Sequence, residues 1–173
     1  MTDIVDTELL IVFADFSGYS AQVERQPDLE VARVLDDWYE LAGGAIAASG
    51  GRVVKFIGDA LLAVFPPEHI DRGVAGMLDL KDTADRFMAG HGWQCILVVK
   101  MNFGSVAAGH FGIGTDRHYD VLGKAVNAAA RLKSKGIIIS GEVFKRVAPG
   151  VQARFTKEAG SDAYLGAPKA ADA

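Results

Sequence analysis

Hydrophobic positions follow two different periods in the first part of the chain. Residues 9–14 form a continuous apolar run that ends at Asp15, and such a run is typical of a strand buried on both faces. Residues 28–48 instead carry apolar side chains at helical spacing, after Pro27 and before a pair of glycines. The pattern therefore predicts a buried strand followed by a long amphipathic helix.

The next segment reads as a β-hairpin. Two short apolar runs, 52–57 and 60–65, are joined by Gly58 and Asp59, which are typical turn residues. Lys55 interrupts the first run. Lys55 and Asp59 lie at even spacing, so on a strand both side chains can point to one face. The pattern raises the question of whether they form an ion pair or have separate partners.

The second half repeats the alternation of helix and strand. Helical spacing over residues 70–88 is followed by two apolar runs, 93–103 and 105–111, which we expect to be two strands hinged at Gly104. The remaining predicted elements are a short strand at 119–122, a helix at 124–134, a strand at 136–140 and a helix at 142–147.

This order of elements predicts the fold. The order β-α-β-β-α-β indicates an α+β domain with a ferredoxin-like split βαβ core, extra C-terminal strands and helices, and an antiparallel or mixed sheet. We expect the first strand to lie beside the strand that follows the first helix. Residues 1–157 are predicted to form the domain, with nothing ahead of it, and residues 158–173, rich in Ala, Gly and charge, a flexible tail.

Composition narrows the class of protein. The chain has 173 residues, 50% hydrophobic and 23% charged, with a net charge of −4, which suits one globular domain and argues against bulk attraction to nucleic acid. An acidic N-terminus and the lack of a long apolar run predict a cytoplasmic protein with no signal peptide or membrane segment. Cys95, the single cysteine, is expected to be a buried hydrophobic residue. Four histidines lack metal-ligand spacing and are expected on the surface or in loops: His69, His91, His110 and His118.

Two groups of polar residues carry candidate chemistry. Asp15 and Asp59 each have an ordinary use at a strand end or turn, but the predicted fold brings them together, and adjacent carboxylates need a cation or a proton. Hard divalent cations with open positions for phosphate suit such a pair. Asn127 and Arg131 are four residues apart on a helix of small side chains, where an arginine can meet an anion. The segment expected to present backbone N–H groups to phosphates is Phe16, Ser17, Gly18, Tyr19 and Ser20.

Three blocks of the sequence resemble the catalytic domain of class III nucleotide cyclases, the adenylate and guanylate cyclases. They read LLIVFADFSGYS, GGRVVKFIGDALLAVF, and GSVAAGHFG with YDVLGKAVNAAARL, and the resemblance covers roughly residues 9–147. Each block alone is weak, but their order and spacing together are specific. The resemblance implies conversion of ATP to cyclic AMP, two divalent cations (Mg²⁺ or Mn²⁺), and a homodimer with active sites shared between the chains.

The resemblance also implies a role for individual residues. Asp15 and Asp59 correspond to the metal-binding aspartates, and Phe16 to the residue whose carbonyl contacts a metal. Lys55 and Asp120 correspond to the pair that selects adenine, because lysine donates to a ring nitrogen and aspartate accepts from the exocyclic amine. Guanylate cyclases have Glu and Cys at these places. Asn127 corresponds to the residue that orients the ribose, and Arg131 to the residue that stabilises the transition state.

Some features depart from the family pattern. Lys124 replaces an Asp or Asn, Lys100 interrupts an apolar strand, and the segment after Arg131 is short. The family's polyphosphate-contacting lysine near the C-terminus has only Lys169 as a candidate. The rival functions are a cyclase-like domain that binds nucleotide or dimerises without turnover, and a guanylate cyclase. A diguanylate cyclase is rejected because the hairpin reads FIGDAL rather than GG[DE]EF.

Overall fold

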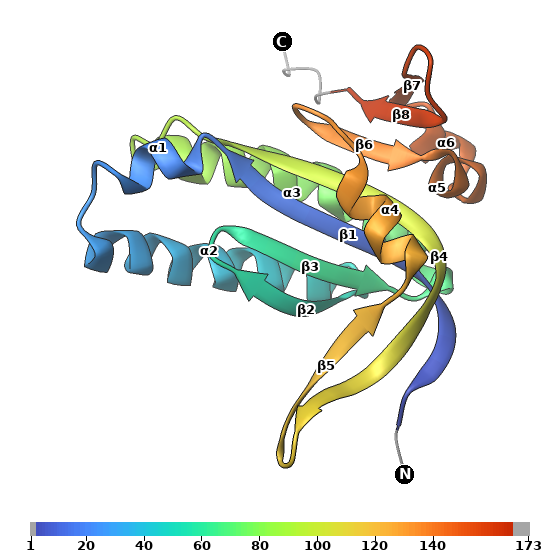
Figure 1. The fold of residues 1–173 in the computed structure, drawn as a ribbon. Helices are drawn as coiled ribbons and strands as arrows, with labels where there is room; N and C mark the ends of the chain where they lie inside the picture. Colours follow the sequence, from blue (N-terminus) through green and yellow to red (C-terminus); the bar gives the residue numbers. More distant parts are fainter. Residues whose placement is uncertain (1–2, 168–173) are drawn as a thin grey trace.

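The computed structural model describes residues 3–167, which form one mixed sheet with helices on both faces (Figure 1). The strands follow the order β2-β3-β1-β4-β6-β8-β7, and β5 pairs with the far half of β4. The predicted α+β fold is confirmed. The strands are β1 (Val5–Ser17), β2 (Arg52–Ile57), β3 (Ala60–Phe65), β4 (Ile96–Ile113), β5 (Asp116–Leu122), β6 (Ile137–Ser140), β7 (Phe155–Lys157) and β8 (Ala163–Gly166).

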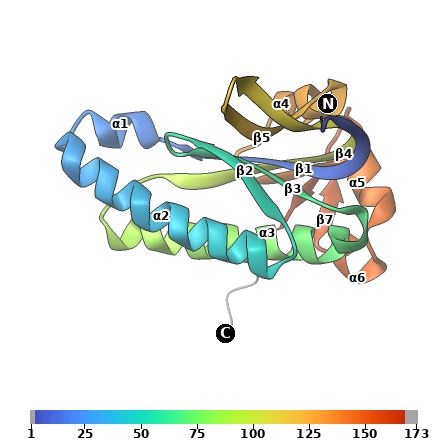
Figure 2. The same ribbon diagram turned by 90° about the horizontal axis from the view of Figure 1, so that it is seen from below.

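Two long helices cover one face of the sheet and a short helix covers part of the other (Figure 2). The long helices are α2 and α3, and the short one is α4. Within the described residues, no helix is both long and apolar enough to cross a bilayer. The helices are α1 (Tyr19–Val23), α2 (Asp28–Ala48), the 3₁₀ turn η1 (Pro67–His69), α3 (Ile70–Gly90), α4 (Lys124–Arg131), α5 (Gly141–Arg146) and α6 (Pro149–Gln152).

The central strand β1 divides the core between the two faces. Its even-numbered side chains, such as Leu10 and Val12, are buried with α2 and α3. Its odd-numbered side chains Leu9 and Ile11 are buried in a smaller cluster under α4. Because successive side chains of a strand point to opposite faces, Asp15 lies on the face that carries α4. We call this the α4 face.

The position of β1 differs from the expectation. It pairs with β3 and β4, and not with β2, the strand that follows the first long helix. The antiparallel register joins Ala14 to Leu61, so the turn that precedes β3 reaches the end of β1. The two aspartates therefore approach each other through β3, a different route from the one predicted.

The segment from 93 to 111 is also different, because it contains one long strand and not two. β4 runs through Gly104 without a break and pairs with β1 along its whole first half. A Cβ on Gly104 would lie 2.9 Å from the Cβ of Ala125, so glycine here permits the first turn of α4 to approach the strand. The glycine marks a close packing contact and not a hinge.

The C-terminal part is more ordered than the sequence suggests. β8 lies in the segment that we expected to be loose, and it pairs antiparallel with β6 and β7. β6 pairs parallel with β4, which makes the sheet mixed, as predicted. Helix α4 ends at Arg131, three residues earlier than expected. Residues 168–173, with Lys169, lie outside the described residues.

Candidate functional site

The first group of site residues lies where the β2–β3 turn meets the end of β1. The backbone N–H of Phe16 donates a hydrogen bond of 2.8 Å to Oδ2 of Asp59. Asp15 precedes Phe16 and is half-buried on the α4 face. The structure therefore brings together Asp15, Phe16 and Asp59, the three residues predicted to bind metal.

Helix α2 holds the turn from the other face. The indole N–H of Trp38 donates to the carbonyl oxygen of Asp59 at 3.2 Å, and the Tyr39 hydroxyl donates to the carbonyl oxygen of Gly58 at 2.6 Å. Gly58 has φ 59°, a conformation that favours glycine. Both turn carbonyls are thus satisfied by α2, and the Asp59 carboxylate is left to face the end of β1.

The surroundings of Asp59, at the junction of the β2–β3 turn with the end of β1, disfavour the ionised form of its carboxyl group when no metal is bound. Burial raises the pKa of the Asp59 carboxyl, the hydrogen bond from Phe16 opposes that shift, and the charge of Asp15 adds to it. Burial also raises the pKa of the Cys95 thiol to about 11, with a further contribution from Asp59. Two carboxylates and a nearby carbonyl are a donor set that fits a hard divalent cation, which would relieve the repulsion.

Asp59→Asn is expected to stabilise the metal-free protein, because it removes a charge that is disfavoured by burial and by Asp15. The amide oxygen can still accept from Phe16. We expect Tm to rise by about 1–3 °C at neutral pH, the usual scale of a stabilising substitution in a domain of this size. Differential scanning fluorimetry in EDTA measures it, with the exposed Asp36→Asn as the control for charge.

The pH dependence has a defined sign. Since the folded-state pKa of Asp59 is raised, its contribution favours folding below the unfolded-state pKa and is lost as the pH rises through the folded value. The Tm difference between Asp59→Asn and wild type should therefore shrink on acidification from about pH 7 to 4. A variant less stable than wild type at neutral pH would contradict this account.

A sharp turn leads from β1 into α1. Gly18 has φ 89°, and a Cβ there would lie 3.0 Å from the carbonyl oxygen of Gln94, so only glycine fits without strain. Ser17 and Ser20 are exposed, and Tyr19 begins α1 with no side chain capping that helix. The segment from Phe16 to Ser20, which was predicted to bind phosphates, therefore contains a sharp turn that follows directly on Asp15.

The second group pairs two residues that are 65 positions apart in the sequence. Nζ of Lys55 on β2 lies 2.6 Å from Oδ2 of Asp120 on β5, with side chains 41% and 22% exposed. The other oxygen of Asp120 accepts from the N–H of Val121 at 2.8 Å. Lys55 thus has its own partner and is not paired with Asp59, and the predicted base-selecting residues are in contact.

A β-bulge explains why Lys55 faces Asp120. The register pairs Arg52 with Val64 but Lys55 with Leu62, so one extra residue is present between Val53 and Lys55. Directly opposed side chains share a face, and Val64 and Leu62 both belong to the cluster under α4. In a regular strand Lys55 would oppose Leu61, in the core under α2 and α3. The bulge therefore moves the lysine from the core face to the α4 face.

The third group lies on α4. Asn127 and Arg131 are exposed, while Val126 and Ala129 are buried against the sheet. The helix is anchored by Asn102, a buried residue of β4 whose side-chain N–H donates to the carbonyl of Ala125 at 3.0 Å. Sequence reasoning missed Asn102, although an amide within an apolar strand was a usable signal.

Asp15, Lys55 and the exposed residues of α4 lie on the α4 face, but among residues 3–167 no ion pair or side-chain hydrogen bond joins one group to another. Among the ion pairs of residues 3–167, none joins Arg131 to Asp15 or Asp59. Lys100, the atypical residue of β4, opposes Phe13 on this face and is half-buried, and Lys124 is exposed at the start of α4. In the described part of the chain, no three His, Cys, Asp or Glu side chains gather as a ready metal cluster.

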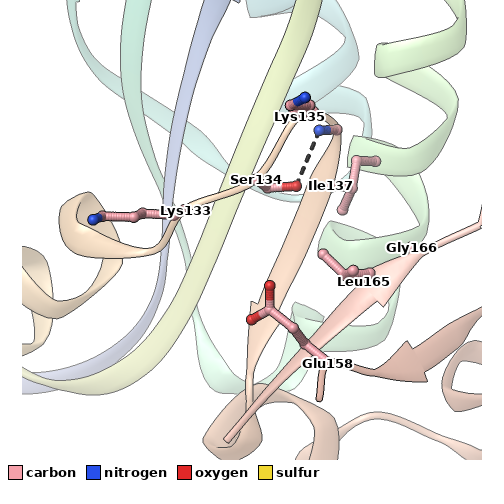
Figure 3. Close-up of a pocket in the computed structure, with 8 residues that line it drawn as sticks. Lys133, Ser134, Lys135, Ile137, Glu158, Leu165 and Gly166 are labelled. Carbon is pink, nitrogen blue, oxygen red and sulfur yellow. Dashed lines mark hydrogen bonds between the residues drawn. The ribbon is translucent and has the colours of Figure 1, made fainter. Parts of the chain in front are cut away.

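A hollow of about 640 Å³ lies away from these groups, between the short connection after α4 and strand β8 (Figure 3). Ser134 accepts from the N–H of Gly136 at 3.0 Å and tightens the connection, and Lys133 points away from the hollow. None of the predicted site residues lines it. A site completed by a second chain would not form a cavity in one chain, so the hollow is no guide to the chemistry.

The chain matches the family described as "Adenylate and Guanylate cyclase catalytic domain" over residues 6–167 and therefore belongs to it. An adenylate cyclase of Anabaena cylindrica is 28% identical over 133 residues, which are 72% of this chain and 26% of the relative. A bacterial light-regulated adenylyl cyclase has a TM-score of 0.84 and 24% identity, over 96% of this chain and 53% of that one. The guanylyl cyclase Cya2 has a TM-score of 0.78 and 22% identity, over 95% and 91%.

These comparisons confirm the family and the fold that the three sequence blocks implied. The chain spans about a quarter of the length of the Anabaena relative. Both adenylyl and guanylyl cyclases are among the solved structures that share the fold, so the family alone leaves the nucleotide base open.

Proposed function

We propose that this chain is the catalytic domain of an adenylate cyclase, which converts ATP into 3′,5′-cyclic AMP and pyrophosphate in the cytoplasm. The observation that carries the proposal is the contact between Lys55 and Asp120, 2.6 Å apart on the face that also holds Asp15. A cationic donor beside an anionic acceptor complements the ring nitrogen and exocyclic amine of adenine. Guanine has the opposite polarity and would leave both side chains without partners, which is costly in a partly buried site.

Asp15, Asp59 and the carbonyl of Phe16 would hold two divalent cations, Mg²⁺ or Mn²⁺, which supply activation of the ribose 3′-hydroxyl and neutralisation of the triphosphate. The 3′-hydroxyl loses its proton to solvent water as its oxygen attacks the α-phosphorus in line, the bond from that phosphorus to the bridging oxygen breaks, and pyrophosphate leaves. The turn from Ser17 to Ser20 offers backbone N–H groups to the phosphates.

The α4 residues complete the reaction. Asn127 orients the ribose, and Arg131 stabilises the charge that develops on the phosphate oxygens in the transition state. For the polyphosphate, Lys157 is a better candidate than Lys169, because the family match ends at residue 167. Lys157 is exposed at the end of β7, next to the turn into β8.

We further propose that two chains share each active site. The chemistry needs Asp15 and Asp59 next to Arg131, whereas within residues 3–167 of a single chain no ion pair joins Arg131 to either aspartate. A two-fold homodimer, which apposes the same face of both chains, would place the aspartates of one chain opposite α4 of its partner and produce two equivalent sites.

The direct test is to incubate purified protein with ATP or GTP, each with Mg²⁺ or Mn²⁺, and to identify the products by chromatography. We expect cyclic AMP from ATP and at least about 100-fold lower kcat/KM for GTP, the scale of discrimination in sites that hydrogen-bond a base. Cyclic GMP as the main product would favour a guanylate cyclase. Binding of ATP without any cyclic product would favour the domain that binds without turnover.

A further inference from the structure

Two contacts, and not one, join the α4 face of β2 to β5. β5 is hydrogen-bonded only to β4 in the described sheet, and its other side approaches β2. The Lys55–Asp120 ion pair is one contact between them. The other is between Arg52 and Tyr119, where the guanidinium carbon lies 3.8 Å from the centre of the ring. A distance of 3.8 Å from the guanidinium carbon to the ring centre is typical of a cation–π interaction.

The second contact is fixed by its surroundings. Arg52 and Lys55 lie on the same face because of the bulge between them. The Tyr119 ring packs on the cluster under α4 and also contacts His110 edge-on, with ring centres 6.0 Å apart and an angle of 70° between the planes. His110 is in turn paired with Asp3. The Tyr119 ring therefore has packing partners besides Arg52.

This arrangement bears on how a base can enter. Lys55 and Asp120 contact each other directly, whereas an adenine between them must replace that contact with one bond to each. The ion pair is then broken, and it no longer joins β2 to β5. The stacked Arg52 and Tyr119 remain, since neither takes part in the ion pair, and they can keep the strands at a constant separation while the flexible lysine moves.

We propose that Arg52 is a positioning residue for base selection, which acts through Tyr119 to fix the spacing of Lys55 and Asp120. The inference rests on the proposed adenylate cyclase function and names a residue that controls its specificity. Arg52 does not touch the reacting atoms. Its removal should therefore affect which base is accepted more than how fast a bound nucleotide reacts.

The test compares Arg52→Gln with Arg33→Gln, which removes the same charge from the exposed surface of α2. We expect Arg52→Gln to raise KM for ATP and to reduce the ratio of kcat/KM for ATP over GTP by about 2- to 5-fold, the range of a cation–π contact at an exposed site, with little change in kcat. Arg33→Gln should leave both unchanged. Tyr119→Phe keeps the ring and should behave as wild type, whereas Tyr119→Leu should resemble Arg52→Gln.

The double variant Arg52→Gln/Tyr119→Leu should have the same ATP:GTP ratio of kcat/KM as either single variant, because both substitutions remove the same contact. An unchanged ATP:GTP ratio in Arg52→Gln, with only a lower Tm or an equal loss for both nucleotides, would overturn the proposal and leave Arg52 a purely structural residue. Arg52→Lys, which keeps the charge, replaces Arg52→Gln if the latter does not fold, with the same expected direction.

Failure of the proposed function is distinguished by calorimetric binding of ATP and GTP to the same variants. If the wild-type protein binds ATP more tightly than GTP but yields no cyclic product, only the cyclase proposal is overturned. The ratio of the Kd values for ATP and GTP in Arg52→Gln then decides the role of Arg52. Wild type with no preference for ATP in either measurement overturns both proposals. If Arg52→Gln retains the wild-type preference for ATP over GTP, only the proposal that Arg52 positions the base-selecting pair is overturned.

Discussion

An equal mixture of Asp15→Ala and Arg131→Ala chains is expected to recover about a quarter of wild-type cyclase activity, although each variant alone is nearly inactive. Random pairing makes half of the dimers mixed, and each mixed dimer has one site with an intact aspartate and an intact arginine. Alone, Arg131→Ala should lose about 10²–10³-fold in kcat, as expected for removal of a group that stabilises transition-state charge. Asp15→Ala should lose at least as much, because it removes a predicted metal ligand.

The matched control mixes Asp15→Ala with Asp59→Ala. Phe16, which follows Asp15, donates to the Asp59 carboxylate, so both substitutions damage the same half of the site and no pairing of chains restores it. Activity is measured as cyclic AMP formed after the chains are mixed and equilibrated, with Tm recorded for each variant. Equal recovery in both mixtures, or none in the first with both chains folded, would contradict a site shared between two chains.

The second large effect is expected at the base-selecting pair. Lys55→Glu combined with Asp120→Cys should invert the nucleotide preference, with a change in the ATP:GTP ratio of kcat/KM of about 10²–10⁴-fold. The glutamate can accept from guanine where the lysine donated to adenine, and the cysteine removes the acceptor for the exocyclic amine. Lys55→Glu alone should impair both nucleotides, because it places two carboxylates where an ion pair of 2.6 Å now stands.

The control for this prediction is Lys145→Glu, which makes the same change of charge on the exposed surface of α5. It should leave the ATP:GTP ratio of kcat/KM as it is in wild type. An ATP preference that survives in the double variant would mean that the base is read elsewhere, and the assignment of Lys55 and Asp120 would be wrong.

Local patterns predicted the elements well where one signal dominated. The helix that became α2 was visible from helical spacing, and the hairpin of β2 and β3 from a Gly-Asp turn between apolar runs. The single strand β4 was misread because glycine inside an apolar run signals either a break or a close approach, and only the contact with Ala125 decides between them. The strand β8 was missed because Ala163–Gly166 is short and is stabilised by pairing with β6 and β7.

In the site, too, local sequence patterns did not predict which strands lie side by side. Asp15 and Asp59 were expected to meet, and they do, but the adjacency depends on β3 lying beside β1, which no local pattern contains. The residue types at Lys55 and Asp120 suggested a pair only through the family resemblance, since 65 positions separate them. The stacking of Arg52 on Tyr119 has no sequence motif, because it depends on the approach of β2 to β5.

The bulge in β2 separates spacing in the sequence from position in the sheet. Val54 is the extra residue, so its deletion would leave Arg52 opposite Val64 and Lys55 opposite Leu62, as in the present register. Loss of one residue between Lys55 and the turn would instead pair the lysine with Leu61 and turn it toward the core, away from Asp120. Among relatives, a gap of one residue before the lysine would therefore be compatible with base selection, whereas a gap of one residue after it would mark its loss.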